Sequence, residues 1–563
     1  IYQIFNISID FEYIENEKEY WLQLTNELLK KEYESFDSFI KDYFNIKDIY
    51  KKHLIENKIN SIKDNENFSF NLWLIKIYLL SKKEFKDNYI TLVLKDLSYY
   101  TYIEFIKNYY LNIFKIQKPN NSLIEERIEG LNILLKRFDC IILEDIAENE
   151  FNKIKEEDLN LYLSGSLEFE KKIIIEKYES LSKIKNFNIN KVYEELIYYL
   201  DDYLIQDKYP DKVFYDYIME YKKSKIKNKI TDNFSELLNK TLPDDIDSFF
   251  SMIYSIDPFT KVINDPDYNE CTIFQIDALG VEFTSLLITL LQKQNPDYDF
   301  DIEICRSELP STTEINKIEN AKFIRDLDYF IHDNIYNYPI SIIKEIHIIK
   351  EIAEKYISPE LQLNKKDYII TGDHGFSTMV IKNFLGKNKY FYENEGHGGR
   401  YIELNNEQNV KFNGEDYAFY ENPINKKKYL IPFKHISLGS TNLIKESHGG
   451  ATIEEILVPV IKAKVNKNKI IYNIEILTKK LNIRNPIIEF KIIPEIKNPK
   501  SLVKFSIEKK LFNFDYNKES KIYTVKVEPP NINKLKFKIK INEKNEYEFE
   551  IDVEKGFVER DLL

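Results

Sequence analysis

Cysteine is scarce in this sequence. Only three of the 563 residues are cysteines, Cys140, Cys271 and Cys305, and they form no Cys-x-x-Cys pair. Neither a zinc knuckle nor a disulfide framework is therefore indicated. This usage fits a protein of the reducing cytoplasm.

Long apolar runs are also lacking. No run of about 18 apolar residues is present, so we expect no membrane span. The charges of Asp10, Glu12, Glu15, Glu17 and Glu19 exclude a secretory signal within residues 1–20. The sequence starts with Ile1 rather than methionine, which leaves open whether an upstream segment is missing.

An excess of positive charge is lacking as well. The chain carries 80 Lys and Arg against 93 Asp and Glu, for a formal net charge of −13. We therefore expect no long-range attraction to nucleic acid or to an anionic membrane. A local basic cleft or a bound metal ion is still compatible with this charge.

Glycine is nearly absent from the first half of the chain. Eleven of the 14 glycines lie between Gly280 and Gly450. Six of the seven histidines fall in the same window, namely His332, His347, His374, His397, His435 and His448. Glycine allows tight turns and close approach of the backbone to a ligand, so we expect the functional site in this window.

The hydrophobic patterns divide the chain into three regions. Residues 1–245 show helical spacing and predict one or two helical domains, with aromatic side chains such as Trp73, Tyr78, Tyr99 and Tyr109 in the core. Residues 246–465 alternate short apolar runs with helices, which predicts a mostly parallel α/β sheet. Residues 466–563 alternate with period two and predict a small β-sandwich of at least six strands.

Chemically reactive side chains follow several apolar runs of the middle region. The predicted strands are Thr272–Ile276 before Asp277, Asp299–Ile304, Asp328–Ile331 before His332, and Tyr368–Thr371 before Asp373 and His374. Carboxyl ends of neighbouring parallel strands share one edge, so these side chains are expected to converge. Aspartate and histidine together suit a dication such as zinc or manganese.

A second motif lies near residue 450. The segment Ser447-His448-Gly449-Gly450 predicts an exposed histidine in a glycine loop, followed by a helix and a last apolar strand. With Asp277-Ala278-Leu279-Gly280 and Leu309-Pro310-Ser311-Thr312-Thr313, these motifs resemble the PglZ family of the alkaline-phosphatase-like superfamily. Its best-known members are components of BREX phage-defence systems, and the resemblance covers roughly Thr272 to Ile461.

The resemblance implies an activity and partners. It implies an alkaline-phosphatase-like core and a metal-dependent phosphatase or phosphodiesterase that carries two zinc ions, or manganese. It favours a diester substrate, such as a nucleotide or nucleic-acid phosphodiester, and other BREX-type defence proteins as partners. The rival interpretation is a catalytically weak or inactive scaffold of a multiprotein defence complex.

The resemblance also assigns residues. Asp277, Asp373 and His374 correspond to the ligands of one metal, and His332 and His448 to those of the second. Thr313, three residues after Pro310, corresponds to the nucleophile, with Thr312 as the alternative.

One position departs from the family pattern, and one loop has two interpretations. The family aspartate four residues after His332 is replaced by Tyr336, so Asp328 or Asp333 is expected to substitute. His397 and Arg400 are expected to bind the substrate phosphate, with a purely structural glycine turn as the alternative.

Overall fold

The structure is a computed structural model of the chain. It describes residues 17–47, 51–136, 138–184, 187–265, 271–381, 395–404, 415–438, 443–466, 472–496, 499–508, 510–528, 532–541 and 545–554. The chain divides into two compact units. The first unit comprises the residues up to Tyr198 together with Lys223–Ile230 and Asn337–Lys344, and the second comprises the remainder. The predicted boundaries after residues 245 and 465 stay predictions, because these units interleave along the chain.

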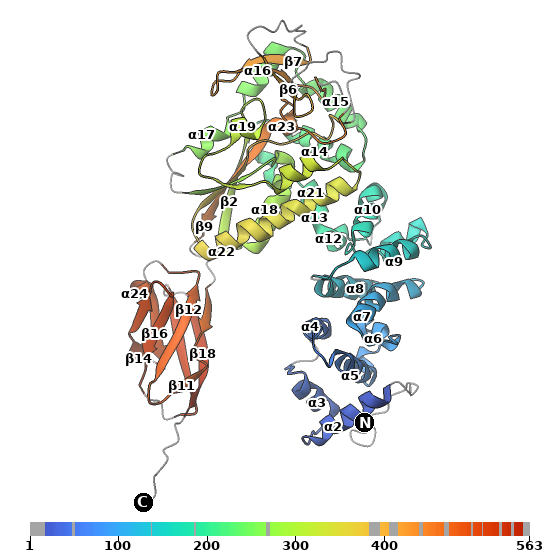
Figure 1. Cartoon of the computed structure of the whole chain (residues 1–563), viewed down its shortest axis with the longest axis vertical. Helices are drawn as coiled ribbons and strands as arrows, with labels where there is room; N and C mark the ends of the chain where they lie inside the picture. Colours follow the sequence, from blue (N-terminus) through green and yellow to red (C-terminus); the bar gives the residue numbers. More distant parts are fainter. Residues whose placement is uncertain are drawn as a thin grey trace, which may run out of the picture. The chain divides into compact units, whose positions relative to one another are not determined.

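The first part of the chain is helical, as predicted, and among the described residues no strand precedes Thr272 (Figure 1). Its α-helices are α2 (Lys18–Leu29), α3 (Phe36–Tyr43), α4 (Leu54–Ser61), α5 (Phe68–Leu80), α6 (Tyr89–Lys95), α7 (Tyr102–Leu111), α8 (Asn121–Leu134), α9 (Ile141–Phe151), α10 (Glu168–Glu176), α11 (Tyr178–Leu181), α12 (Ile189–Val192), α13 (Glu194–Leu200), α14 (Lys212–Ile226), α15 (Asp232–Thr241), α16 (Ile246–Tyr254) and α17 (Phe259–Ile263).

Aromatic side chains form much of the core of the first unit. Trp73, Tyr78 and Tyr109 are at most 1% exposed, as predicted from their spacing. Tyr99 contradicts that prediction because it is 70% exposed. None of the described helices combines the length and the apolar character needed to cross a bilayer.

The second unit contains a five-stranded mixed sheet in the order β2-β9-β4-β1-β3. Its strands are β1 (Thr272–Ile276), β2 (Tyr298–Arg306), β3 (Lys322–Ile324), β4 (Tyr368–Gly372) and β9 (Leu457–Val465). The helices after β1 are α18 (Thr284–Gln294), α19 (Thr313–Asn316), α20 (Asp326–Asp333), α21 (Ile340–Glu351), the π-helix η8 (Ile352–Ile357), α22 (Ser358–Asn364) and α23 (Ile453–Ile456).

The direction of strand β9 determines which loops meet. β1 pairs in parallel with β3 and β4, whereas β9 pairs antiparallel with β4 and β2. The start of β9 therefore lies at the edge where β1, β2 and β4 end. Phe259 and Ile263 of α17 pack on one face of this sheet against Ile369 and Val460, and Figure 1 shows α17 beside β2 and β9.

The predicted strand Asp328–Ile331 is wrong. This segment lies in helix α20, where Leu327 and Ile331 are both buried. Residues four apart occupy one face of a helix, so Leu327 and Ile331 pack inward, while Asp328 and His332 share a different face. The apolar run is too short for its period to separate a helix from a strand.

A small antiparallel sheet carries the second glycine-rich segment. It has the order β5-β6-β8-β7, with β5 (Glu395–Gly396), β6 (Tyr401–Leu404), β7 (Tyr417–Glu421) and β8 (Lys428–Pro432). Its core contains Ile402, Tyr417, Leu430 and Leu438. The turn between β5 and β6 presents His397.

The carboxyl-terminal strands form two sheets with one shared hydrophobic core, as predicted for a β-sandwich. The orders are β10-β12-β16-β15 and β11-β18-β17-β13-β14. The elements are β10 (Asn473–Ile476), β11 (Lys480–Asn482), β12 (Ile487–Ile493), α24 (Pro499–Leu502), β13 (Val503–Ile507), β14 (Lys510–Phe512), β15 (Phe514–Asn517), β16 (Ile522–Lys526), β17 (Lys534–Ile541) and β18 (Asn545–Glu554). Ile471, within the region predicted to be a β-sandwich, lies outside the described residues.

Strands β17 and β18 form a hairpin. The strands are antiparallel, and Phe537 lies opposite Phe549 on the face toward the core. On the other face Lys536 lies opposite Glu550, and Lys538 lies opposite Glu548. Lys536 and Lys538 therefore lie on the outer face of the strand, with acidic side chains opposite them.

Candidate metal centre

Three side chains and a hydroxyl group meet where β1 and β4 end. Asp277 follows β1, Asp373 and His374 follow β4, and Thr313 begins α19. His374 Nε2 lies 3.5 Å from Asp277 Oδ1 and 3.5 Å from Asp373 Oδ2. The Thr313 hydroxyl donates to Asp277 Oδ1 at 2.9 Å and lies 3.1 Å from His374 Nε2. The structure therefore brings this predicted group together.

The two carboxylates of this first group accept few hydrogen bonds. Asp373 Oδ1 accepts the backbone N–H groups of Ala278 and His374, each at 3.0 Å, whereas its buried Oδ2 has no hydrogen-bond partner. Burial, together with the charges of Asp373 and Asp328, raises the pKa of Asp277 to about 8. Burial raises the pKa of Asp373 to about 7. Such a pair of carboxylates favours a bound cation.

A second group lies beside the first and contains Asp328, His332 and His448. Asp328 Oδ1 lies 3.2 Å from His332 Nε2 and 3.4 Å from His448 Nε2, and the two Nε2 atoms are 2.9 Å apart. Asp328 Oδ1 is buried, and neither contact has hydrogen-bond geometry. Burial acts to raise the pKa of Asp328, but the adjacent imidazoles of His332 and His448 hold that pKa below its ordinary value.

Two histidines each have a backbone carbonyl oxygen next to Nδ1, and this contact fixes their tautomers. His374 Nδ1 lies 3.1 Å from the Gly375 carbonyl oxygen, and His448 Nδ1 lies 3.1 Å from that of Ser311. A carbonyl only accepts, so each Nδ1 carries the proton and each Nε2 presents a lone pair to its group. Burial lowers the pKa of both His374 and His448 to about 4, which keeps both imidazoles neutral.

The donor sets fit divalent cations. Bonds of about 2.0–2.1 Å to a tetrahedral ion place its ligand atoms roughly 3.3 Å apart. The separations within the second group, 2.9, 3.2 and 3.4 Å, surround that value, and those from His374 Nε2 in the first group are 3.5 Å. The imidazole rings of His374 and His448 stack with centroids 4.0 Å apart, so the two groups adjoin.

Glycines let the loops approach closely enough to form this centre. A Cβ on Gly372 would lie 2.1 Å from the Leu279 carbonyl oxygen, and one on Gly375 would lie 2.1 Å from that of Glu454. The loop after β1 thus rests directly on β4, and the loop after β4 rests on helix α23. No side chain fits between these backbones.

The prediction that Arg400 binds substrate is wrong in this structure. Arg400 and Glu455 are both 0% exposed, and Arg400 Nε and Nη2 donate to the Glu455 carboxylate at 3.0 and 2.6 Å. Arg400 Nη1 donates to the carbonyls of Lys434 and Ile436. The guanidinium therefore holds the glycine turn in place, which was the structural alternative.

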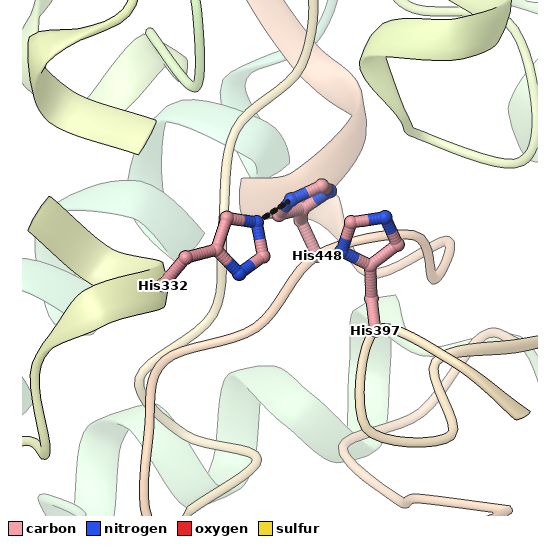
Figure 2. Close-up of side chains that lie close together, drawn as sticks. All are labelled: His332, His397 and His448. Atoms are coloured by element: carbon pink, nitrogen blue, oxygen red, sulfur yellow. Dashed lines mark hydrogen bonds between the residues drawn. The ribbon is translucent and has the colours of Figure 1, made fainter. Parts of the chain in front are cut away.

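His397 faces the second group. Figure 2 shows the imidazoles of His332, His397 and His448 approaching one another from three separate segments. The ring centroids of His397 and His448 are 4.0 Å apart, and one ligand nitrogen of each of the three rings lies within 4.8 Å of the others. Burial, with His448 and His332 nearby, lowers the pKa of His397 to about 3, so this imidazole is neutral.

A buried polar network supports the loop that contains His448. Tyr217 donates to Glu454 Oε2 at 2.6 Å, and His435 Nε2 lies 2.9 Å from Glu454 Oε1. Burial acts to raise the pKa of Glu454, but His435 and the hydrogen bonds to this carboxylate lower it to about 2. His435 therefore helps to hold this carboxylate in place.

The structure bears on two expectations, the exposure of His448 and the position of the acidic residue near His332. His448 is 1% exposed, so the predicted exposed histidine is wrong. Asp328 lies in the second group, whereas Asp333 is exposed at the end of α20. The i to i+4 spacing of Asp328 and His332 was the sequence signal for this choice, and it became readable only once the segment was known to be helical.

A comparison with known families finds no matching family model, and a comparison with characterised proteins finds no match.

Proposed function

We propose that this chain is a metal-dependent phosphohydrolase with an alkaline-phosphatase-like core that acts on phosphodiesters. The observation that carries the proposal is a threonine hydroxyl beside two adjoining ligand groups, each with a buried carboxylate oxygen that lacks a hydrogen-bond partner. Asp277, Asp373 and His374 would hold one cation, and Asp328, His332 and His448 the other. When bound, two such cations would stabilise charge on the attacking and leaving oxygens of a phosphoryl transfer.

Thr313 is the proposed nucleophile. Its hydroxyl donates to Asp277 Oδ1 and lies 3.1 Å from His374 Nε2, so a cation held by these residues would favour loss of the hydroxyl proton to water as Oγ1 attacks phosphorus. A bond from Oγ1 to phosphorus forms while the bond from phosphorus to the leaving alkoxide breaks, and the alkoxide leaves as an alcohol once protonated by water. Water then hydrolyses the phosphothreonine, which releases a phosphate monoester and restores the hydroxyl. Thr312 is the N-cap of α19 and makes no side-chain cap hydrogen bond, so it has no comparable contact among those described.

The substrate class and the biological setting rest on the resemblance to the PglZ family. We propose a phosphodiester of a nucleotide or nucleic acid as substrate, zinc as the cation, and other BREX-type phage-defence proteins as partners. The scaffold rival drew its support from Tyr336 at an expected ligand position. Asp328, which lies beside His332 and His448, would supply the carboxylate in its place, and this favours the enzyme over the scaffold.

The test compares single-hydroxyl variants in the full chain. Zinc-loaded wild type is expected to hydrolyse bis-p-nitrophenyl phosphate, Thr313→Ala to lose at least about 1,000-fold in kcat, and Thr312→Ala to retain turnover within about tenfold. Zinc content and melting temperature of each variant, measured in parallel, separate lost chemistry from lost structure. Undiminished hydrolysis by Thr313→Ala would remove this residue from the proposed role. A wild type that binds no divalent cation would end the hydrolase proposal.

A further inference from the structure

His397 occupies a backbone conformation that is costly for histidine. Its φ is 46°, in the left-handed region, and the following Gly398 and Gly399 have φ of 67° and 81°. A left-handed conformation is disfavoured for a residue with a Cβ, because the Cβ comes too close to the following carbonyl oxygen. A strained residue that persists beside a cluster of ligands is a sign of function, because the surrounding structure must hold it there.

The turn that presents His397 is fixed on several sides. Ser447, the residue before His448, donates its hydroxyl proton to the His397 carbonyl. Ser437 donates to the Gly398 carbonyl at 2.6 Å, and the Leu438 N–H donates to that of Gly399 at 2.8 Å. The buried guanidinium of Arg400 anchors the far end of the turn to Glu455. These bonds hold the imidazole of His397 beside that of His448.

We infer that His397 is the fourth protein ligand of the second cation, together with Asp328, His332 and His448. This inference rests on the metal centre of the proposed function and adds a ligand to it. One nitrogen of His397 lies within 4.8 Å of the ligand nitrogens of His332 and His448, and the unpartnered Asp328 Oδ1 lies 3.2 and 3.4 Å from Nε2 of those two residues. The second position then has one carboxylate and three imidazoles.

The donor sets of the two positions consequently differ in chemistry. The first position offers two carboxylates and one imidazole, whereas the second offers the imidazoles of His332, His397 and His448 together with the carboxylate of Asp328, which lies beside His332 and His448. Imidazole nitrogen favours zinc over manganese or magnesium, and four protein ligands complete its usual tetrahedral shell. The second position should therefore bind zinc more tightly than the first. A role limited to phosphate contact predicts no effect of His397 on zinc affinity.

The experiment measures zinc binding to the full chain without any substrate. The metal-free protein is titrated with Zn²⁺ against a chromophoric chelator, and with Co²⁺ while its visible absorption is recorded. The variant His397→Asn removes the imidazole and keeps a residue that tolerates the left-handed conformation. His397→Gly, which adopts that conformation without strain, is used if the Asn variant fails to fold. His347→Asn is the matched control, because the His347 side chain is 56% exposed on helix α21.

Wild type and His347→Asn are expected to bind two zinc equivalents with one tighter than the other. The His397 variant should weaken the tighter class by at least about tenfold, the lower end of what even an outer-shell partner of a metal ligand contributes. Its Co²⁺ absorption should change as one imidazole is lost. Tight zinc binding within about twofold of wild type, with an unchanged cobalt spectrum, would overturn the inference. If the wild type hydrolyses the substrate but the His397 variant binds zinc as tightly as wild type, only this inference is overturned. If the variant binds zinc more weakly but the wild type does not hydrolyse the substrate, only the proposed reaction is overturned.

Discussion

Replacing Arg400 with alanine tests whether this side chain holds the site together or binds substrate. The guanidinium is fully buried, forms a two-bond ion pair with Glu455, and also donates to two backbone carbonyls. Glu455 in turn accepts the N–H groups of Gly450 and Thr452. The substitution would therefore leave a buried carboxylate without its cation and release the turn that carries His397.

The expected loss of stability is large. Breaking a buried ion pair by removing one partner costs about 3–5 kcal/mol. The second unit has about 350 residues, and an unfolding entropy of about 2.1 cal/mol/K per residue gives roughly 1.4 °C in melting temperature for each kcal/mol, so its transition should fall by roughly 4–7 °C. The exposed pair of Lys427 and Glu403, with side chains 46% and 45% exposed, belongs to the same small sheet. Lys427→Ala should cost no more than about 1 kcal/mol and serves as the control.

Calorimetry is the appropriate assay because the chain's fluorescence reports on the other unit. Both tryptophans, Trp21 and Trp73, lie in the first unit. Arg400→Ala should therefore lower a calorimetric transition and leave the midpoint of tryptophan fluorescence unchanged. A melting temperature within about 1 °C of wild type, accompanied by weaker binding of phosphate, would refute this reasoning and restore the substrate-binding role.

Three further results are expected. EDTA should lower the melting temperature of zinc-loaded protein, because a ligand that binds only the folded state stabilises it; no response would argue against a metal centre. Asp328→Asn should weaken zinc binding at least about tenfold whereas the exposed Asp333→Asn should not, and equal affinities would remove Asp328 as a ligand. The pKa of Glu454 is about 2 in the fold against an ordinary 4.5, so its stabilisation is present above pH 4.5 and is lost as pH falls toward 2. Glu454→Gln should be less stable than wild type near pH 7 but lose less stability on acidification, and parallel unfolding curves would contradict this.

Much of the sheet edge was predictable from local pattern. Asp277 and the pair Asp373-His374 each follow an apolar run that forms a strand, and parallel pairing of β1 with β4 brings them together. The His448 loop precedes the last apolar run, as expected. Its arrival at the same edge depends on the antiparallel direction of β9, which no local pattern encodes.

The remaining features depend on partners far away in sequence. The segment Asp328–Ile331 was predicted to be a strand but is helical, because a short apolar run does not distinguish the two. Arg400 next to glycines resembles an anion-binding loop, but its guanidinium pairs with Glu455, 55 positions later. The burial of His448 follows from the packing of several loops around one point, which composition and spacing do not report.

The backbone contacts at Gly372 and Gly375 have a consequence for how the centre responds to change. Where two loops touch through their main chains, no flexible side chain is available to absorb a displacement of either one. A shift of the segment that bears Asp277 would pass directly to the segment that bears Asp373 and His374, and from there to the start of α23. The three ligands of the first position, Asp277, Asp373 and His374, should therefore move together as one rigid piece.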